Sequence, residues 1–193
     1  MIIGSVSENK DIEKRISITP ELAKKYISNG FQILLETDYG LHLGISNDNF
    51  IKEGCKITSK ENILKQSDIL LQLNLLDESI LNDLKKNHIL IGNFNSIQNQ
   101  ERIKKINSKK ISVFSLELLP RITRAQSMDI LSSQANLAGY KAVIDSFARF
   151  KKAIPMMMTA AGTITAAKVL VVGAGVAGLQ AIATAKRMGA IVF

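Results

Sequence analysis

Residues 168–178 read KVLVVGAGVAG, an apolar run that passes directly into three glycines. Residues 168–172 have the pattern of a buried β-strand, and residues 179–188 have that of a helix, with Gly189 placed to end it. Residues 190–193 have the pattern of a second strand. A strand, a glycine turn, a helix and another strand in this order predict the first part of a βαβ unit.

The three glycines of this turn have the spacing of a dinucleotide-binding fingerprint. Gly173 would permit the tight turn, Gly175 would let the backbone approach a pyrophosphate, and Gly178 would let the helix pack closely on the strand. Free N–H groups at the start of the helix, together with its positive dipole end, favour a phosphate anion. We therefore expect the turn to bind a cofactor through Gly173, Ala174, Gly175, Val176, Ala177 and Gly178. A glycine-rich turn inside an ordinary βαβ unit is the alternative.

The fingerprint also requires an acidic residue about 20 residues further on, which binds the ribose hydroxyls. Counted from Gly173, this position falls at the end of the chain, and no Asp or Glu follows Asp145. The sequence also ends within a predicted strand. We therefore expect an N-terminal fragment of a longer protein, and the usual acid gives no basis for choosing between NAD and NADP.

The first 116 residues alternate apolar, β-branched runs with helical patterns. Thr19 and Pro20 are placed to begin the first helix, and Gly30 is placed to end it. Near-continuous apolar strands separated by helices predict a doubly wound parallel sheet covered on both faces, hence an α/β domain. We expect strands at 2–6, 31–36, 55–58, 69–73, 88–92 and 111–116, with helices from residue 20 and at 48–53, 59–65, 77–86 and 98–107.

The composition excludes several classes of site. The chain has 193 residues, 46% of them apolar, with one cysteine, two histidines and no tryptophan. These counts rule out an internal disulfide and leave little for a metal site, so we expect none. The net charge of +8 comes from interleaved acids and bases, which indicates a solvated surface rather than a nucleic-acid stripe. Residues 169–185 carry no charge, but a buried strand, turn and helix explain them better than a membrane helix.

Pro120 interrupts the alternation. Thr123 and Gln126 have the spacing of a capping box, which predicts a long helix over 124–152 that links two domains. We expect an N-terminal α/β domain at 1–123, the linking helix, and a truncated NAD-binding Rossmann domain at 153–193 that opens with a small-residue connector over 156–167.

Four stretches of the chain closely resemble the alpha subunits of proton-translocating NAD(P) transhydrogenases. The longest and most specific is RITRAQSMDILSSQANLAGYKAV at 121–143. The others are MMMTAAGT at 156–163, GVAGLQAIATAKRMGA at 175–190 and RISITP at 15–20, the last of which alanine dehydrogenases share. The resemblance covers essentially the whole chain and places it in the superfamily of alanine dehydrogenase and transhydrogenase.

The resemblance implies an activity and an assembly. Such a subunit binds NAD(H) in a cleft between two α/β domains and passes hydride from NADH to NADP+ on a partner subunit, coupled to proton translocation. It is a Re/Si-specific enzyme with a beta subunit and a membrane domain as partners. We expect a homodimer of alpha, no nucleic acid, and a cytoplasmic location peripheral to the inner membrane. The fragment alone is expected to be inactive.

The resemblance also implies the residues that position the nicotinamide for hydride transfer: Arg121, Gln126, Asp129 and Ser132, with Arg124 as a further cofactor contact. Their chemistry agrees, because Asp accepts hydrogen bonds from ribose hydroxyls and Arg, Gln and Ser can bind a carboxamide. On a helix from Arg124, residues 126, 129 and 132 (or 133) recur every third position and would form one polar stripe. The alternative is that Gln126 and Asp129 only cap the helix.

Alanine dehydrogenase and a non-catalytic NAD-binding protein are the competing hypotheses. Reduction of an imine needs a proton donor, and the related dehydrogenases carry a Lys near position 72 and a His near position 93. This chain has Gln72 and Asn93, and neither can act as a general acid near neutral pH. Of the expected substrate-binding groups only Arg15 remains, and we interpret His42 and His88 as structural. Hydride transfer between two nicotinamides needs no substrate proton, so the missing acid favours transhydrogenase.

Overall fold

The computed structural model describes all residues, Met1–Phe193. The chain divides into two compact units, Met1–Pro120 and Arg121–Phe193, and each is described by itself. None of its helices combines the length and the apolar character needed to cross a bilayer.

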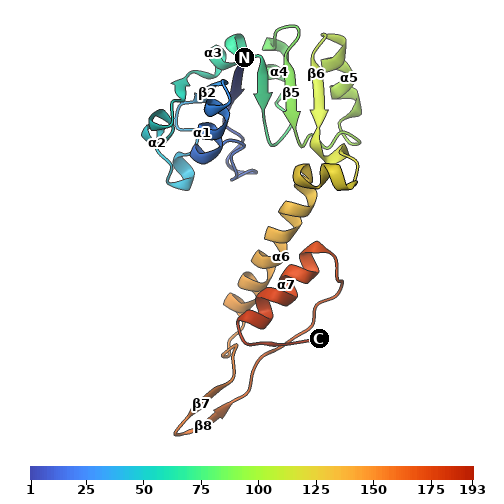
Figure 1. Cartoon of the computed structure of the whole chain (residues 1–193). Helices are drawn as coiled ribbons and strands as arrows, with labels where there is room; N and C mark the ends of the chain where they lie inside the picture. The colour runs from blue at the N-terminus through green and yellow to red at the C-terminus, as the bar shows by residue number, and fades with distance from the viewer. The chain divides into compact units, whose positions relative to one another are not determined.

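The first unit is built on a six-stranded sheet in which all neighbouring strands run parallel (Figure 1). The spatial order β3-β2-β1-β4-β5-β6 reverses direction between β1 and β4, as in a doubly wound fold. The expected fold class is therefore confirmed. The strands are β1 (Ile2–Ser5), β2 (Gln32–Glu36), β3 (Lys56–Thr58), β4 (Ile69–Leu71), β5 (Ile89–Gly92) and β6 (Ser112–Ser115).

Helices connect the strands near the positions that the sequence predicted. Thr19 caps the first helix by accepting the Leu22 N–H, Pro20 occupies the first position, and Gly30 takes the left-handed conformation after the end. The helices are α1 (Pro20–Ser28), α2 (Asn47–Lys52), α3 (Lys60–Gln66), α4 (Glu78–Asp83) and α5 (Gln100–Ser108), with short 3-10 turns η1 (Leu41–Leu43) and η2 (Leu116–Leu118).

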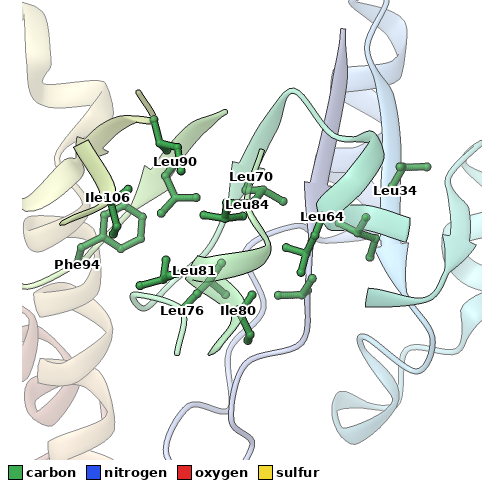
Figure 2. Packing of buried hydrophobic residues seen from close by; sticks show 13 residues of the cluster. Leu34, Leu64, Leu70, Leu76, Ile80, Leu81, Leu84, Leu90, Phe94 and Ile106 are labelled. Carbon is green, nitrogen blue, oxygen red and sulfur yellow. The ribbon is translucent and has the colours of Figure 1, made fainter. Parts of the chain in front are cut away.

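Two apolar cores lie on opposite faces of this sheet, because successive side chains of a strand point in opposite directions. Leu34 and Leu70 pack with Leu64 of α3, Leu81 of α4 and Ile106 of α5 in the core shown in Figure 2. Their neighbours Ile33, Leu35 and Leu71 join the other core, which α1 and α2 cover. Coverage on both faces is what makes these strands apolar throughout.

The second unit contains two packed helices, α6 (Ile130–Arg149) and α7 (Val176–Arg187), which lie side by side (Figure 1). Val143 and Ala185 form its small buried core with Ala190, joined by Phe147 and Ile154. The remaining elements are the 3-10 turn η3 (Thr123–Met128), the antiparallel pair β7 (Met157–Thr159) and β8 (Gly162–Ile164), and the parallel pair β9 (Lys168–Val169) and β10 (Ile191–Val192).

The predicted helix over 124–152 was wrong at both ends. The chain forms the 3-10 turn η3 over Thr123–Met128, and neither Thr123 nor Gln126 makes the capping box, since the N-cap of η3 is Ile122 with no side-chain bond. Asp129 caps α6 instead, because its carboxylate accepts the Ser132 N–H. The helix ends at Arg149, where Phe150 turns to an extended conformation.

Two further segments of this unit differ in detail from the sequence predictions. Part of the connector over 156–167 is the hairpin β7–β8, whose turn uses Gly162 at φ 133° and a bond from the Thr159 hydroxyl to the Gly162 carbonyl. The strand over 168–172 was expected to be buried, but β9 pairs only with β10, and Leu170 and Val172 are 74% and 91% exposed. No second layer covers these two side chains in the structure.

Candidate dinucleotide-binding site

The turn before α7 has the backbone geometry that its glycines predict. Gly173 adopts φ +103°, a left-handed conformation that other residues rarely adopt, and Gly175 is the N-cap of the helix. A Cβ at Gly178 would clash with the carbonyl oxygen of Gly173, so this position needs a glycine for close packing. A Cβ at Gly175 would meet no atom within 4 Å, so that glycine faces open space.

The start of α7 also depends on Gly139 in the middle of α6. Gly139 is buried, and a Cβ there would clash with the backbone carbonyl of Ala177 in the first turn of α7. The absence of a side chain at Gly139 therefore lets the two helices approach closely. Sequence reasoning missed this residue, although a glycine inside a helix costs about 1 kcal/mol relative to alanine and commonly indicates a close approach.

An open hollow of about 460 Å³ lies between the first turns of α6 and the glycine turn. Arg121 and Ser132 line it together with Gly173, Gly175 and the first residues of α7. Leu131, Ala135 and Val172 supply its apolar lining. The first N–H groups of α7 have no partner within the helix, so this end carries partial positive charge.

Asp129 lies one turn before Ser132 and bonds to it twice. Its Oδ1 accepts the Ser132 N–H at 2.9 Å, and its Oδ2 accepts the Ser132 hydroxyl at 2.7 Å. The Ser132 N–H, then its hydroxyl, and also the charge of Arg121 hold the pKa of the Asp129 carboxyl below its ordinary value. Asp129 is therefore ionised at neutral pH.

The structure brings part of the expected residue set together. Arg121, Ser132, Gly173, Gly175, Val176, Ala177 and Gly178 line the hollow, and Asp129 is attached to it through Ser132. Arg124 and Gln126 lie exposed on η3, and neither they nor Ala174 belong to this lining. The continuous helical stripe through residues 126, 129 and 132 does not form, because the α-helix begins only at Ile130. Ser133 bonds to the Ile130 carbonyl, which leaves Ser132 as the serine of the site.

This arrangement fits the diphosphate and the polar end of a dinucleotide. The open space in front of Gly175 and the free N–H groups of α7 suit a phosphate, because both let an anion approach the backbone. Arg121 adds a permanent cation with several donors, and Ser132 adds a hydroxyl.

Gln72 and Asn93 occupy the positions at which, by the resemblance, related dehydrogenases carry a Lys and a His. Gln72 is buried after β4, and its Oε1 accepts the Val6 N–H at 2.8 Å while its Nε2 donates to the Val6 carbonyl and to Glu8 Oε1, each at 3.2 Å. Asn93 offers an amide whose buried Oδ1 has no hydrogen-bond partner. Neither side chain can supply a proton near neutral pH.

Arg15, His42, His88 and Cys55 are the other side chains of the first unit that the sequence analysis considered for chemistry. Arg15 forms a two-point ion pair with Glu13, with Nε–Oε1 and Nη2–Oε2 distances of 2.8 and 2.6 Å. His42 bonds to the Lys14 carbonyl and buried His88 to the Ser67 carbonyl, and burial lowers the pKa of His88. Burial raises the pKa of Cys55 to about 11, so this thiol is protonated and unreactive at neutral pH.

Comparison with known sequences identifies the family of the chain. The sequence model for the N-terminal domain of alanine dehydrogenase/PNT matches residues 4–138, and the model for the C-terminal domain matches residues 142–193. The chain belongs to the alanine dehydrogenase/PNT family.

Individual members of the alanine dehydrogenase/PNT family can be compared with this chain. It is 45% identical to an NAD(P) transhydrogenase subunit alpha protein of Rickettsia prowazekii and 44% identical to the corresponding protein of Rhodospirillum rubrum. All of the chain aligns in both cases, but it spans only 51% and 52% of these relatives. The solved transhydrogenase structure from Sinorhizobium meliloti superposes with a TM-score of 0.94 at 42% identity, over all of this chain and 57% of that one.

Proposed function

We propose that this chain is the NAD(H)-binding part of the alpha subunit of a Re/Si-specific, proton-translocating NAD(P) transhydrogenase. The observation that carries the proposal is the hollow where Arg121 and Ser132 face the glycine turn of α7. The names and the 44–45% identity of the relatives from Rickettsia and Rhodospirillum support it. In this proposal the chain binds NAD(H), and NADP(H) binds on a partner subunit.

The proposed roles divide between the two sides of the hollow. The turn from Gly173 to Gly178, including Ala174, would bind the diphosphate through backbone N–H groups. Arg121 and Ser132, with Asp129 behind Ser132, would bind the nicotinamide end. Arg124 and Gln126 lie outside the lining of the hollow, so their proposed contacts with the cofactor rest on the family resemblance alone.

Hydride transfer between two nicotinamides needs accurate positioning and no acid or base. This requirement is supported by the site, because the pKa of the Asp129 carboxyl is lowered and no histidine lines the hollow. The chain's residues would therefore act by orientation: the backbone of the turn fixes one end of the cofactor, and the start of α6 fixes the other.

We also propose the assembly and the division of the chain. Relatives named subunit alpha support an assembly with other subunits. The proposed partners are a beta subunit, a membrane domain that carries the proton path, and a second alpha subunit, at the cytoplasmic side of the inner membrane. The proposed division is an N-terminal domain at 1–123, a linking segment at 124–152 and a Rossmann segment from 153, with no turnover by residues 1–193 alone.

Alanine dehydrogenase is the second candidate, because the family includes it. Its reaction requires a proton at the imine nitrogen, and the carboxyl edge of the first unit offers Gln72 and Asn93 for this purpose. Gln72 is further disfavoured because both ends of its amide are already bonded to Val6, Ser5 and Glu8. A non-catalytic NAD-binding protein is the third candidate.

Three assays on the intact polypeptide that contains these residues separate the candidates. When it is mixed with its NADP-binding partner subunit, we expect hydride transfer from NADH to an NADP+ analogue, followed by absorbance. We expect no NADH oxidation with pyruvate and ammonia. Pyruvate-dependent oxidation would establish alanine dehydrogenase instead. NADH binding in a calorimeter without turnover in either assay would favour the non-catalytic protein.

A further inference from the structure

A second open hollow lies within the first unit, between α4 and α5, and has a volume of about 350 Å³. Its lining includes the cations Arg102, Lys105 and Lys109 and a single carboxylate, that of Glu78. We call this feature the basic hollow. It shares no residue with the dinucleotide site, whose lining residues all belong to the second unit. The two hollows are therefore separate features of the chain.

Hydrogen bonds hold two of these cations in place. Arg102 Nη2 donates to the Leu76 carbonyl at 2.7 Å, in the segment before α4. Lys109 Nζ donates to Asn82 Oδ1 at 2.8 Å and to the Leu81 carbonyl at 3.3 Å. Because these bonds restrict both long side chains, binding a ligand between them would cost less conformational entropy.

The cations of the basic hollow keep donors for a ligand. A guanidinium has five N–H donors and an ammonium has three, more than these bonds use. The Nε of Arg102 is shielded from solvent and has no hydrogen-bond partner, so an oxygen acceptor beside the guanidinium would satisfy a buried donor. Lys105 Nζ lies 3.6 Å from Glu78 Oε1, and the exposure of both side chains makes this ion pair weak.

The charge of the surrounding chain favours an anion in the basic hollow. Its own lining carries three cations against one carboxylate, which leaves an excess of two positive charges. Residues 77–110, which contain α4 and α5, carry seven Lys and Arg residues against four Asp and Glu residues. A concave surface with an excess of one sign of charge attracts ligands of the opposite sign.

We infer that the basic hollow binds a phosphate group. A phosphate monoester carries about two negative charges at neutral pH and three terminal oxygens, so it has an acceptor for each of the three cations. The guanidinium fork also matches phosphate geometry. A carboxylate has one charge and two oxygens, and it would engage fewer of these donors. The inference does not depend on the proposed function, because the basic hollow lies outside the dinucleotide site.

Calorimetric titration of the intact polypeptide with inorganic phosphate tests the inference, at constant ionic strength and with NADH present. The NADH occupies the glycine turn before α7, the other place where we expect a phosphate to bind. We expect phosphate to bind under these conditions, and acetate to bind at least about tenfold more weakly. No phosphate binding, or binding that NADH abolishes, would overturn the inference. Failure of NADH itself to bind would reject the proposed function alone.

Two substitutions should weaken phosphate binding. Arg102→Gln should do so by at least about tenfold, because a charged donor is lost. Lys105→Gln should do so by about threefold, since solvent screens its exposed ammonium. Circular dichroism checks that both variants fold. Lys104→Gln, on the same helix but outside the lining, is the matched control and should bind phosphate as the parent does. Equal weakening by Lys104→Gln and Lys105→Gln would overturn the inference.

Glu78→Gln makes the opposite prediction. It removes the carboxylate from the lining and releases Lys105, so phosphate should bind about threefold more tightly. Glu101→Gln, at the exposed pair with Lys104, is its control and should bind phosphate as the parent does. If the cations serve only to attach α5 to α4, Glu78→Gln will leave phosphate binding unchanged, and that result would overturn the inference.

A dissolved phosphate ester and a lipid headgroup share this chemistry, and sedimentation with vesicles separates the two. Phosphatidylcholine vesicles that contain phosphatidic acid present a phosphate monoester, whereas pure phosphatidylcholine vesicles do not. Sedimentation with the first kind alone, lost in Arg102→Gln and kept in Lys104→Gln, would assign a lipid headgroup to the basic hollow. Phosphate binding without sedimentation would assign a dissolved ester. Sedimentation lost equally in both variants would show general attraction to the lysines and would overturn the inference.

Discussion

Among the individual residues of the proposed site, two glycines of the turn and Arg121 have separable roles. Gly175 and Gly178 belong to the same motif, but the structure gives them different tasks. Gly178 permits the turn to close on the helix, whereas Gly175 leaves space in front of the turn. The two positions therefore separate an effect on folding from an effect on binding.

Gly175→Ala should leave the fold intact and reduce the affinity for NADH by at least about tenfold, since the added methyl group occupies the space left for a phosphate. Gly178→Ala should lower the free energy of unfolding, because its Cβ collides with the Gly173 carbonyl. Thermal unfolding and calorimetry on both variants check this. Equal thermal destabilisation of the two variants would contradict it.

Arg121→Ala should slow hydride transfer by about ten- to a hundredfold in the intact polypeptide with its NADP-binding partner, because a charged donor is lost from the hollow. Arg149→Ala, in the last turn of α6 and exposed, is the matched control and should transfer hydride at the parent rate. An unchanged rate in Arg121→Ala would remove this residue from the proposed site.

At the scale of the element, the packing of α6 on α7 positions the site. Their contact is possible only because Gly139 presents no side chain to Ala177. This dependence links a residue in the middle of one helix to the first turn of another, and so to the N–H groups that face the hollow.

Gly139→Ala should lower the free energy of unfolding by about 1–3 kcal/mol, the usual cost of overpacking. It should also weaken NADH binding, because α7 has to move. Ala138→Ser, on the exposed side of the same helix, is the control and should change the stability by about 0.5 kcal/mol or less. Denaturant unfolding measures both. A stable Gly139→Ala variant with parental affinity would show that the contact does not position the turn.

Local sequence patterns predicted an element correctly where only one signal for its start or end was present. Thr19 with Pro20 marked the start of α1, and the glycine spacing marked the turn before α7. After Pro120 two residues that can cap a helix, Thr123 and Asp129, lie six positions apart; the structure uses Asp129, and the preceding residues form η3 with Ala125 buried. The contribution of Gly139 depends on a residue 38 positions away, Ala177, and no local pattern contains it.

At the scale of the whole molecule, the two units have very different cores. The first unit buries large side chains on both faces of its sheet, including Tyr39, Phe50 and Phe94. The core cluster of the second contains only one valine and two alanines among its buried residues, and apolar residues such as Leu170 and Phe193 are exposed. Stability should therefore be distributed unevenly along the chain.

Amide hydrogen exchange should show this difference. We expect the slowest exchange in the central strands β1, β2 and β4, and exchange about a hundredfold faster in β9, β10 and α7. NADH at about 100 times its Kd should raise the free energy of opening in the second unit by up to about 2.7 kcal/mol and slow its amide exchange accordingly. The strands of the first unit serve as the internal reference. Protection confined to the first unit would contradict the proposed location of the site.

Acid should destabilise the first unit through Glu13. The Arg15 guanidinium holds the pKa of the Glu13 carboxyl at about 2, below its ordinary 4.5. The ion pair therefore contributes its full stability to the fold at pH values above about 4.5. This stability is lost as the pH falls from about 4.5 to 2, and it amounts to about 1 kcal/mol because solvent reaches the half-exposed Arg15. Denaturant midpoints across this range should fall less in Glu13→Gln than in the parent. Glu101→Gln, at an exposed pair, should follow the parent.

The embedding of Gln72 also has a consequence for protein engineering. Its amide connects the end of β4 to the segment that follows β1, through bonds to Val6 and to Glu8. A lysine at this position would bring an ammonium group into a site that the neutral Gln72 amide now fills. It would also leave the Val6 N–H without its acceptor. Installing an amino-acid dehydrogenase pocket in this scaffold therefore calls for joint redesign of residues 5–8 and 72–74 rather than a point replacement.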